Sequence, residues 1–235
     1  MNKGKCAACK VPNKVCRTPG GHSPVFCSTN LYGEAIAKAA AEYDKSDIRE
    51  FARQASVQEA ECYIDRDANP PYLYPVKPRI QELIEFSHKM GYKRLGLAFC
   101  AGLHQEAAVV SRIFETHGLE VVSVICKVGG VKKEKLDIKP SEQVMIGEYE
   151  TMCNPIAQAE VLNAAGTDFN ILLGLCVGHD SLFIKYSQPM VSVLAVKDRV
   201  TGHNPLAAIY TYDSYYQRFK AYRLKKLTVA DGKQE

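Results

Sequence analysis

The sequence predicts an α/β protein, with a mostly parallel sheet and helices on both faces, preceded by a small cysteine-rich metal-binding segment and two helices. Three observations lead to this prediction. Short apolar runs typical of buried strands recur after residue 90. Helical patterns separate most of these runs, as in parallel sheets covered by helices. The first 27 residues hold four of the nine cysteines and almost no core-forming residues.

The first predicted domain spans residues 1–68 and contains the cysteine-rich segment and the two helices. Ser28, Thr29 and Asn30 can cap a helix over 31–43, and Ser46 can cap a second helix over 47–63. Residues 69–78 contain four prolines, which exclude a continuous helix or a central strand. This segment is therefore predicted to be a linker.

The second predicted domain spans residues 79–235 and carries the sheet. Pro78 can open its first helix, and Gly91 can end it. A lysine-rich loop over 127–150 interrupts the alternation of strands and helices. Strands are predicted at 94–99, 120–125, 169–175 and 190–196, and further helices over 103–114 and 155–166.

Composition and charge narrow the classes of function. The formal net charge of +4 is mild and scattered, so no nucleic acid partner is expected. The basic N-terminus lacks the apolar stretch of a signal peptide, and the strongest apolar run, 171–177, is too short to span a membrane. We therefore expect a cytoplasmic protein. Thiols stay reduced in that compartment, so nine cysteines indicate metal or redox chemistry rather than disulfides.

The first group of cysteines comprises Cys6, Cys9, Cys16 and Cys27, spaced C-x2-C-x6-C-x10-C. A C-x2-C pair can place two sulfur atoms on one metal, and two further cysteines complete a tetrahedral thiolate site. A metal could organise a segment that has little apolar core of its own. Zinc and an iron–sulfur cluster both remain open for this site. The alternative is an unstructured tail with incidental thiols.

The second group comprises Cys100, Cys126, Cys153 and Cys176. Cys100, Cys126 and Cys176 each directly follow a predicted strand, and Cys153 precedes a helix that Asn154 and Pro155 would start. They are separated by 26, 27 and 23 residues, about one strand–helix unit each. All strand ends of one direction meet at one edge of a parallel sheet, where ligands bind. We therefore expect the four thiols to share a crevice at that edge.

The chemistry of this second group favours a [4Fe–4S] cluster, with zinc as the alternative, because the set has four thiolates and no histidine. Helix N-termini behind Cys100, Cys153 and Cys176 would lower the pKa values of these thiols. Each cysteine taken alone is better explained by burial in the core, whereas four cysteines at equivalent places favour a shared site. Cys62 is left unassigned, as a further ligand of the N-terminal site or as a buried thiol.

The loop over 197–205, Lys-Asp-Arg-Val-Thr-Gly-His-Asn-Pro, follows the last predicted strand and should reach the same edge. Arg199 could bind an anionic small-molecule substrate, and His203 could act as acid, base or metal ligand. They are the catalytic candidates. The alternative is a surface turn that caps the next helix, and for His104 and Asp180 such a structural role is favoured.

Several stretches together resemble a family of predicted metal-binding proteins of anaerobic bacteria and archaea, classed only as a domain of unknown function. They are 94–103 around Cys100, 152–160 around Cys153, 174–180 around Cys176, 197–205, and the N-terminal Cys6-Ala-Ala-Cys9. The resemblance covers nearly the whole chain and implies metal binding through cysteines. It implies no particular reaction.

Two classes of function follow from these observations. In the first, the protein is an oxygen-sensitive iron–sulfur protein whose crevice takes a small molecule for redox or Lewis-acid chemistry. In the second, it is a non-catalytic module in which zinc or another metal is carried, sensed or used structurally. The sequence leaves the choice between enzyme and binding module open, and it sets no oligomeric state.

Overall fold

The computed structural model describes residues 3–69 and 73–221. The chain forms two compact units, Met1–Lys77 and Pro78–Glu235, and each is described by itself. Among the described residues, none of the helices has both the length and the apolar character needed to cross a membrane.

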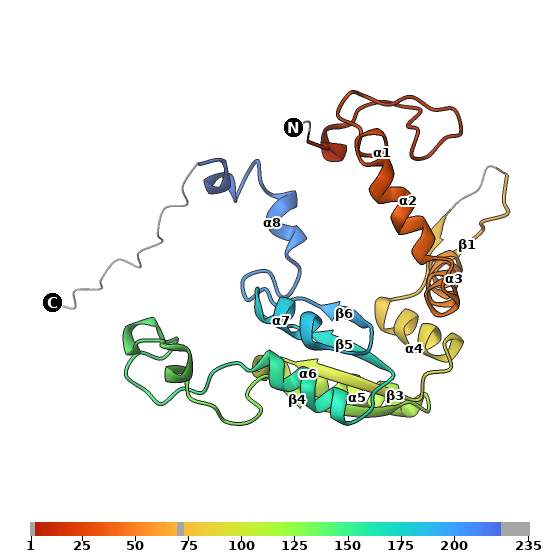
Figure 1. Ribbon diagram of the computed structural model, residues 1–235. Coiled ribbons are helices and arrows are strands. Elements are labelled where there is room, and N and C mark those ends of the chain that lie inside the picture. The colour runs from red at the N-terminus through yellow and green to blue at the C-terminus, as the bar shows by residue number, and fades with distance from the viewer. Residues whose placement is uncertain (1–2, 70–72, 222–235) are drawn as a thin grey trace. The chain divides into compact units, whose positions relative to one another are not determined.

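The first unit begins with the short 3-10 helix η1 (Cys6–Ala8) and an irregular segment, followed by the helices α1 (Ser28–Leu31), α2 (Gly33–Glu42) and α3 (Ser46–Glu61) (Figure 1). Alanine-rich α2 is a strong helix former by composition. No residue from 3 to 57 is buried. The irregular segment therefore has little hydrophobic burial to hold it.

The proline-rich segment contributes one strand of a pair that the linker prediction did not include, and the other strand directly follows Cys62. The strands β1 (Tyr63–Ile64) and β2 (Tyr74–Pro75) pair antiparallel, and Val76 N donates to Cys62 O at 2.9 Å. Pro75 is tolerated because a two-stranded ribbon consists only of edges.

The second unit contains the parallel sheet that the sequence predicts, and the α/β fold is confirmed. Its strands are β3 (Arg94–Phe99), β4 (Glu120–Ile125), β5 (Phe169–Leu173) and β6 (Val191–Ala195). They lie in the order β4-β3-β5-β6, and all three neighbouring pairs are parallel (Figure 1). The chain leaves β3 towards β4 and then crosses back to β5, so the order reverses between β3 and β5.

Helices α4 (Arg79–Lys89), α5 (His104–Thr116), α6 (Pro155–Ala164) and α7 (His179–Tyr186) accompany the strands. Helix α6 begins as the sequence predicts, with the Asn154 side chain accepting from Ala157 N at 3.1 Å and Pro155 as first residue. Helix α4 begins one residue later than expected, after Pro78.

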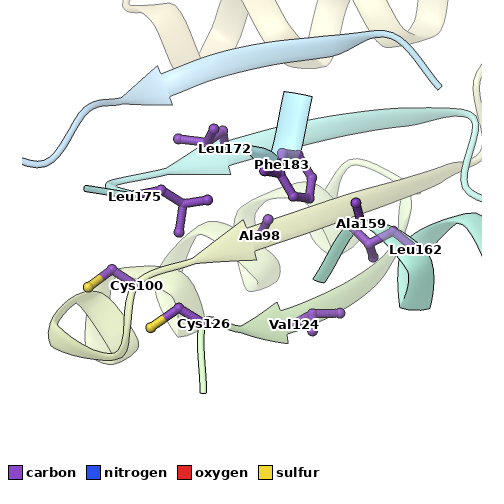
Figure 2. Packing of buried hydrophobic residues seen from close by; sticks show 9 residues of the cluster. All are labelled: Ala98, Cys100, Val124, Cys126, Ala159, Leu162, Leu172, Leu175 and Phe183. Carbon is purple, nitrogen blue, oxygen red and sulfur yellow. The ribbon is translucent and has the colours of Figure 1, made fainter. Parts of the chain in front are cut away.

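One face of the sheet is covered by α6 and α7. Figure 2 shows this core, in which side chains of β3, β4 and β5 pack against Ala159 and Leu162 of α6 and Phe183 of α7. Phe86 of α4 contacts Phe169 of β5 with ring centroids 5.7 Å apart. Because side chains alternate along a strand, Phe169 lies on the face opposite to Leu172, so helices cover both faces.

Two long connections lie outside these layers. Residues 127–152 contain the 3-10 helices η3 (Lys133–Leu136) and η4 (Pro140–Glu142), and an ion pair of 2.8 Å joins Lys133 to Glu150. After β6, the chain continues through a polar loop into α8 (Leu206–Tyr210) and the 3-10 helix η5 (Gln217–Lys220).

Candidate metal centre

Cys100 and Cys126 are brought together by the register of the sheet. Phe99 pairs with Ile125, so each cysteine is the first residue beyond the same level of the ladder. Cys100 lies on the face of Ala98, and Cys126 on the face of Val124. Both cysteines are buried, and Figure 2 shows their sulfur atoms at the carboxyl ends of β3 and β4.

Cys153 joins them because the 127–152 loop returns to its starting point. Asn154 N donates to Cys126 O at 2.7 Å, and Lys127 Nζ donates to Thr151 O across the base of the loop. The Sγ atoms of Cys126 and Cys153 are 3.9 Å apart. Cys153 thus packs against the core that α6 shares with the sheet.

The pKa values of the three thiols depend on one another. Hydrogen bonding with Cys126 is the main reason why the pKa of Cys100 is lowered to about 5 and that of Cys153 to about 6. The same hydrogen bonding, together with burial, raises the pKa of Cys126. Ala101 N also donates to Cys126 Sγ at 3.3 Å. The sequence argument assigned low thiol pKa values to helix N-termini, whereas neighbouring thiols are the larger cause here.

Cys176 follows β5 and pairs with a cation. Arg199 Nη2 donates to Cys176 Sγ at 3.2 Å. This hydrogen bond, followed by the charge of Cys176, raises the pKa of Arg199, and the charges of Cys100 and Cys153 contribute in the same direction. Three cysteines of the second group, Cys100, Cys153 and Cys176, therefore act electrostatically on Arg199.

Lys197 brings a second positive charge to this edge. A Cβ atom at Gly102 would lie 3.1 Å from Lys197 Nζ, so glycine leaves room for the ammonium group. Lys197 contributes to the low pKa of Cys100 by its charge and by a hydrogen bond. The charges of Lys127 and His179 act on Cys153 in the same sense. Cationic side chains thus stabilise the negative charge that Cys100 and Cys153 would carry as thiolates.

His203, the other catalytic candidate, makes its hydrogen bonds within its own loop. It adopts a positive φ of 66°, and its Nδ1 atom accepts from Asp198 N at 3.1 Å. Asp198 accepts in turn from Val200 N and Thr201 N at 2.9 and 3.0 Å. These contacts are those of a polar turn, and none of these contacts involves a cysteine.

The two remaining polar candidates have structural contacts. Asp180 Oδ1 accepts from Gly178 N and Ser181 N at the start of α7. The ring of His104 packs edge-on against Phe99, with centroids 6.0 Å apart.

The position of the thiols in the fold is that of a ligand site. The strand order reverses between β3 and β5, and open α/β sheets bind ligands outside the carboxyl ends of their strands at such a point. Cys100 follows β3, and Cys176 lies behind β5. In the described parts of the chain, however, no three Cys, His, Asp or Glu side chains are already arranged to coordinate one ion. Binding a metal would require rotation of thiol side chains.

The four N-terminal cysteines line a common cavity of about 260 Å³ in the first unit. His22, Lys14 and Arg17 line it as well. Two backbone bonds, from His22 N to Asn13 O at 2.7 Å and from Val15 N to His22 O at 2.9 Å, close a loop over 13–22 that contains Cys16. A hydrogen bond of 3.1 Å with Ser28 Oγ is the main cause of the lowered pKa of Cys6.

Cys62 lies apart from these groups. It is buried at the end of α3, and its thiol donates to Gln58 O at 3.0 Å. The described contacts give it the role of a buried thiol of the first unit.

The fold and the site define a doubly wound α/β protein with a cluster of thiols at the carboxyl edge of its sheet. A family model described as "Protein of unknown function (DUF1847)" matches residues 27–194, and the chain belongs to this family. The chain is also 46% identical over 169 residues to an uncharacterized protein of Methanocaldococcus jannaschii, which covers 72% of this chain and 83% of that protein. No solved structure matches the chain.

The family match includes all four cysteines at the sheet edge but not Cys6, Cys9 or Cys16. It also ends before Arg199 and His203.

Sequence reasoning missed two residues near the thiols. Lys197 was noted only as part of a polar loop, although its position directly behind a strand was the available signal. His22 stands between Cys16 and Cys27, and histidine is a common metal ligand at such spacings.

Proposed function

We propose that this protein is a cysteine-ligated metalloprotein whose principal centre is held by Cys100, Cys126, Cys153 and Cys176. One observation carries the proposal: Cys126, which directly follows β4, lies between Cys100 and Cys153, with its sulfur atom 3.9 Å from that of Cys153. Residues that are 53 positions apart in sequence meet here at the edge where this class of fold binds ligands.

The surroundings of the thiols support a metal centre over an ordinary buried cluster. Several thiolates brought together repel one another unless cations or hydrogen-bond donors compensate them. Lys127, Lys197, Arg199 and the N–H group of Ala101 supply such compensation. A core made only of buried thiols would need none of these groups.

A [4Fe–4S] cluster is the first candidate for the bound group. Cys126, Cys100 and Cys176 follow three adjacent strands, and neighbouring strands are about 4.8 Å apart. A cluster spans such a row because each cysteine binds a different iron. When bound, it would supply electron transfer or an open iron site as a Lewis acid.

A single zinc ion is the second candidate, and the distance between Cys126 and Cys153 favours it. Two thiolates on one tetrahedral zinc, with bonds of about 2.3 Å, have sulfur atoms about 3.8 Å apart. The observed 3.9 Å is close to this value. Cys100 and Cys176 would then complete the ligand set after side-chain rotation.

We place a second centre in the N-terminal cavity, with Cys6, Cys9, Cys16 and Cys27 as ligands. All four line the cavity, and the segment around it has no buried residue. A metal there would serve structure, most simply as zinc, because it replaces the missing core.

An enzymatic role would use the positive charge of the sheet edge. Arg199 and Lys197 lie beside Cys176 and Cys100, so a small anionic molecule would be attracted to the open side of the centre. His203 belongs to the same loop as Arg199, and its hydrogen bonds hold the turn that presents Arg199.

The deciding experiment is metal and acid-labile sulfide analysis of protein purified without oxygen, together with an absorption spectrum. A cluster would make the protein brown, with broad absorption near 400 nm, roughly where thiolate–iron charge transfer is expected. Colourless protein with stoichiometric zinc and no sulfide would replace the cluster by zinc. Protein free of both metals, and unable to bind them on reconstitution, would refute the metalloprotein.

A further inference from the structure

Gln158 is a fully buried polar residue in the first half of α6, directly beneath the thiol cluster. Its Nε2 atom donates to Val124 O at 2.7 Å and to Phe99 O at 3.2 Å. A single amide group thus bonds to the backbone of both β3 and β4. Its side chain reaches across the face of the sheet that α6 covers.

These two carbonyl groups belong to residues just before Cys100 and Cys126 in the chain. Phe99 directly precedes Cys100, and Val124 stands two residues before Cys126. Cys126 N also donates to Phe99 O, at 2.9 Å. Gln158 therefore binds the backbone of the last two residue pairs of β3 and β4, directly before the two cysteines.

Gln158 also connects these strand ends to the third cysteine. Cys153 directly precedes Asn154, the cap of α6, and Gln158 N donates to Asn154 O at 3.0 Å in the first turn of the helix. The backbone that carries Cys153 and the two strand ends that carry Cys100 and Cys126 are thus joined through one side chain.

The burial of this amide has an energetic cost. Its Oε1 atom is buried and has no hydrogen-bond partner among the described residues. An unpaired buried carbonyl lowers the stability of the folded protein, whereas methionine would fill a similar space without that cost. Packing alone therefore does not explain glutamine at this position.

We propose that Gln158 is a positioning residue, which holds Cys100, Cys126 and Cys153 in the mutual arrangement that binds the metal. This inference rests on the proposed function of the sheet edge as a metal centre. Groups that orient metal ligands typically change metal affinity about 10- to 100-fold when they are removed. Gln158 acts on the backbone of the ligands rather than on their sulfur atoms.

The test compares Gln158→Met with Asn170→Leu, a matched control. Asn170 is also fully buried, and its amide bonds Thr167 and Ser187 at 2.8 and 2.7 Å, near the amino end of β5 and away from the cysteines. Both variants are made in full-length protein carrying Cys6→Ser and Cys9→Ser, so that the N-terminal cavity does not contribute. The probes are zinc chloride and, in parallel, ferrous iron with sulfide under nitrogen.

We expect Gln158→Met to bind the metal about 10- to 100-fold more weakly in competition with a chelator. We expect Asn170→Leu to retain its affinity within about threefold, even if its melting temperature falls as far as that of Gln158→Met. Equal metal affinity in both variants would overturn the positioning role. If Gln158→Met does not fold, Gln158→Asn keeps an amide too short to reach both carbonyls and should show the same selective loss.

A second measurement separates this inference from the proposed function. In metal-free protein, the ratio of iodoacetamide modification rates at Cys100, Cys126 and Cys153 reports their arrangement without any metal. We expect this ratio to change at least threefold in Gln158→Met and to stay constant in Asn170→Leu. If wild-type protein binds no metal, the proposed function fails, and this ratio still decides whether Gln158 positions the thiols. An unchanged ratio would refute the positioning role in that case.

Discussion

Replacement of Cys126 by serine tests whether metal binding and the stability of the α/β unit are linked. Cys126 is 3% exposed and lies in contact with both Cys100 and Cys153. Cys126→Ser keeps the size of the side chain but removes the central candidate ligand. Cys62→Ser makes the same change at a buried cysteine that is 7% exposed and lies outside the proposed centre.

The expected magnitude has two parts. Without metal, each substitution buries a hydroxyl group in place of a thiol, which costs about 1–3 kcal/mol if the hydroxyl remains unpaired. With metal present at 100 times its dissociation constant, binding to the folded state adds about 2.7 kcal/mol to the free energy of unfolding. Cys62→Ser retains this gain, whereas Cys126→Ser loses most of it.

Hydrogen exchange at the amides of β3 and β5 measures this gain in the α/β unit itself, with and without zinc chloride or reconstituted iron and sulfide. The proteins all carry Cys6→Ser and Cys9→Ser, which removes the N-terminal site. Comparing each variant with its own metal-free form cancels the intrinsic cost of the substitution. If Cys126→Ser gained as much protection from the metal as Cys62→Ser, Cys126 would not be a ligand.

Two further predictions concern thiol chemistry and the N-terminal segment. In metal-free protein, alkylation of Cys153 should reach half its maximal rate near pH 6 and fall at lower pH as the thiolate is protonated, because hydrogen bonding from Cys126 lowers its pKa to about 6. A midpoint near the ordinary value of about 8.5 would show that this bond is absent in solution. Replacing Cys6 and Cys9 by serine should raise hydrogen exchange over residues 3–30 and leave β3 and β5 unchanged, since no residue from 3 to 57 is buried. Equal loosening of β3 would show that the two units do not fold separately.

The strands could be predicted closely because their signal is local. Buried parallel strands are short and apolar throughout, so the bounds of β3 and β4 follow directly from the runs that Gly91 and Gly118 precede. The predicted runs over 169–175 and 190–196 were each two residues too long, because Leu175 is buried beyond the end of β5 and Met190 lies before β6. Backbone hydrogen bonds also continue past these strand ends, since Asn170 N donates to Met190 O at 3.0 Å and Lys197 N donates to Leu175 O at 3.2 Å.

The order of the strands was not predictable in the same way. Hydrophobic patterns reveal which residues form strands, whereas the order β4-β3-β5-β6 depends on the direction in which each crossover turns. The β1–β2 pair was missed because Pro70, Pro71, Pro75 and Pro78 dominate that stretch, and such residues exclude a central strand but not a two-residue edge pairing.

The position of Cys100 and Cys126 at one edge of the sheet could be predicted from topology, since strand ends of a parallel sheet share one edge. Topology did not predict which thiol lies between the other two. Cys126 holds that place because β4 neighbours β3 and because the loop over 127–152 returns to its base, and neither fact is visible in the spacing. Gln158 could not be identified either, because the partners of a buried amide depend on the packing of α6 against the sheet.

The two groups of cysteines differ in the apolar burial around them, and this difference bears on what a metal at each would do. Around Cys6, Cys9, Cys16 and Cys27, no side chain is buried, so a metal there would contribute order that the chain lacks. Cys100 and Cys126 instead belong to a core that buries Leu172 and Phe183, so this part of the chain has apolar burial of its own. A metal at this edge would therefore contribute less to folding than one in the N-terminal cavity. The proposed role at the open side of the sheet would account for the gathered thiols and the cations beside them.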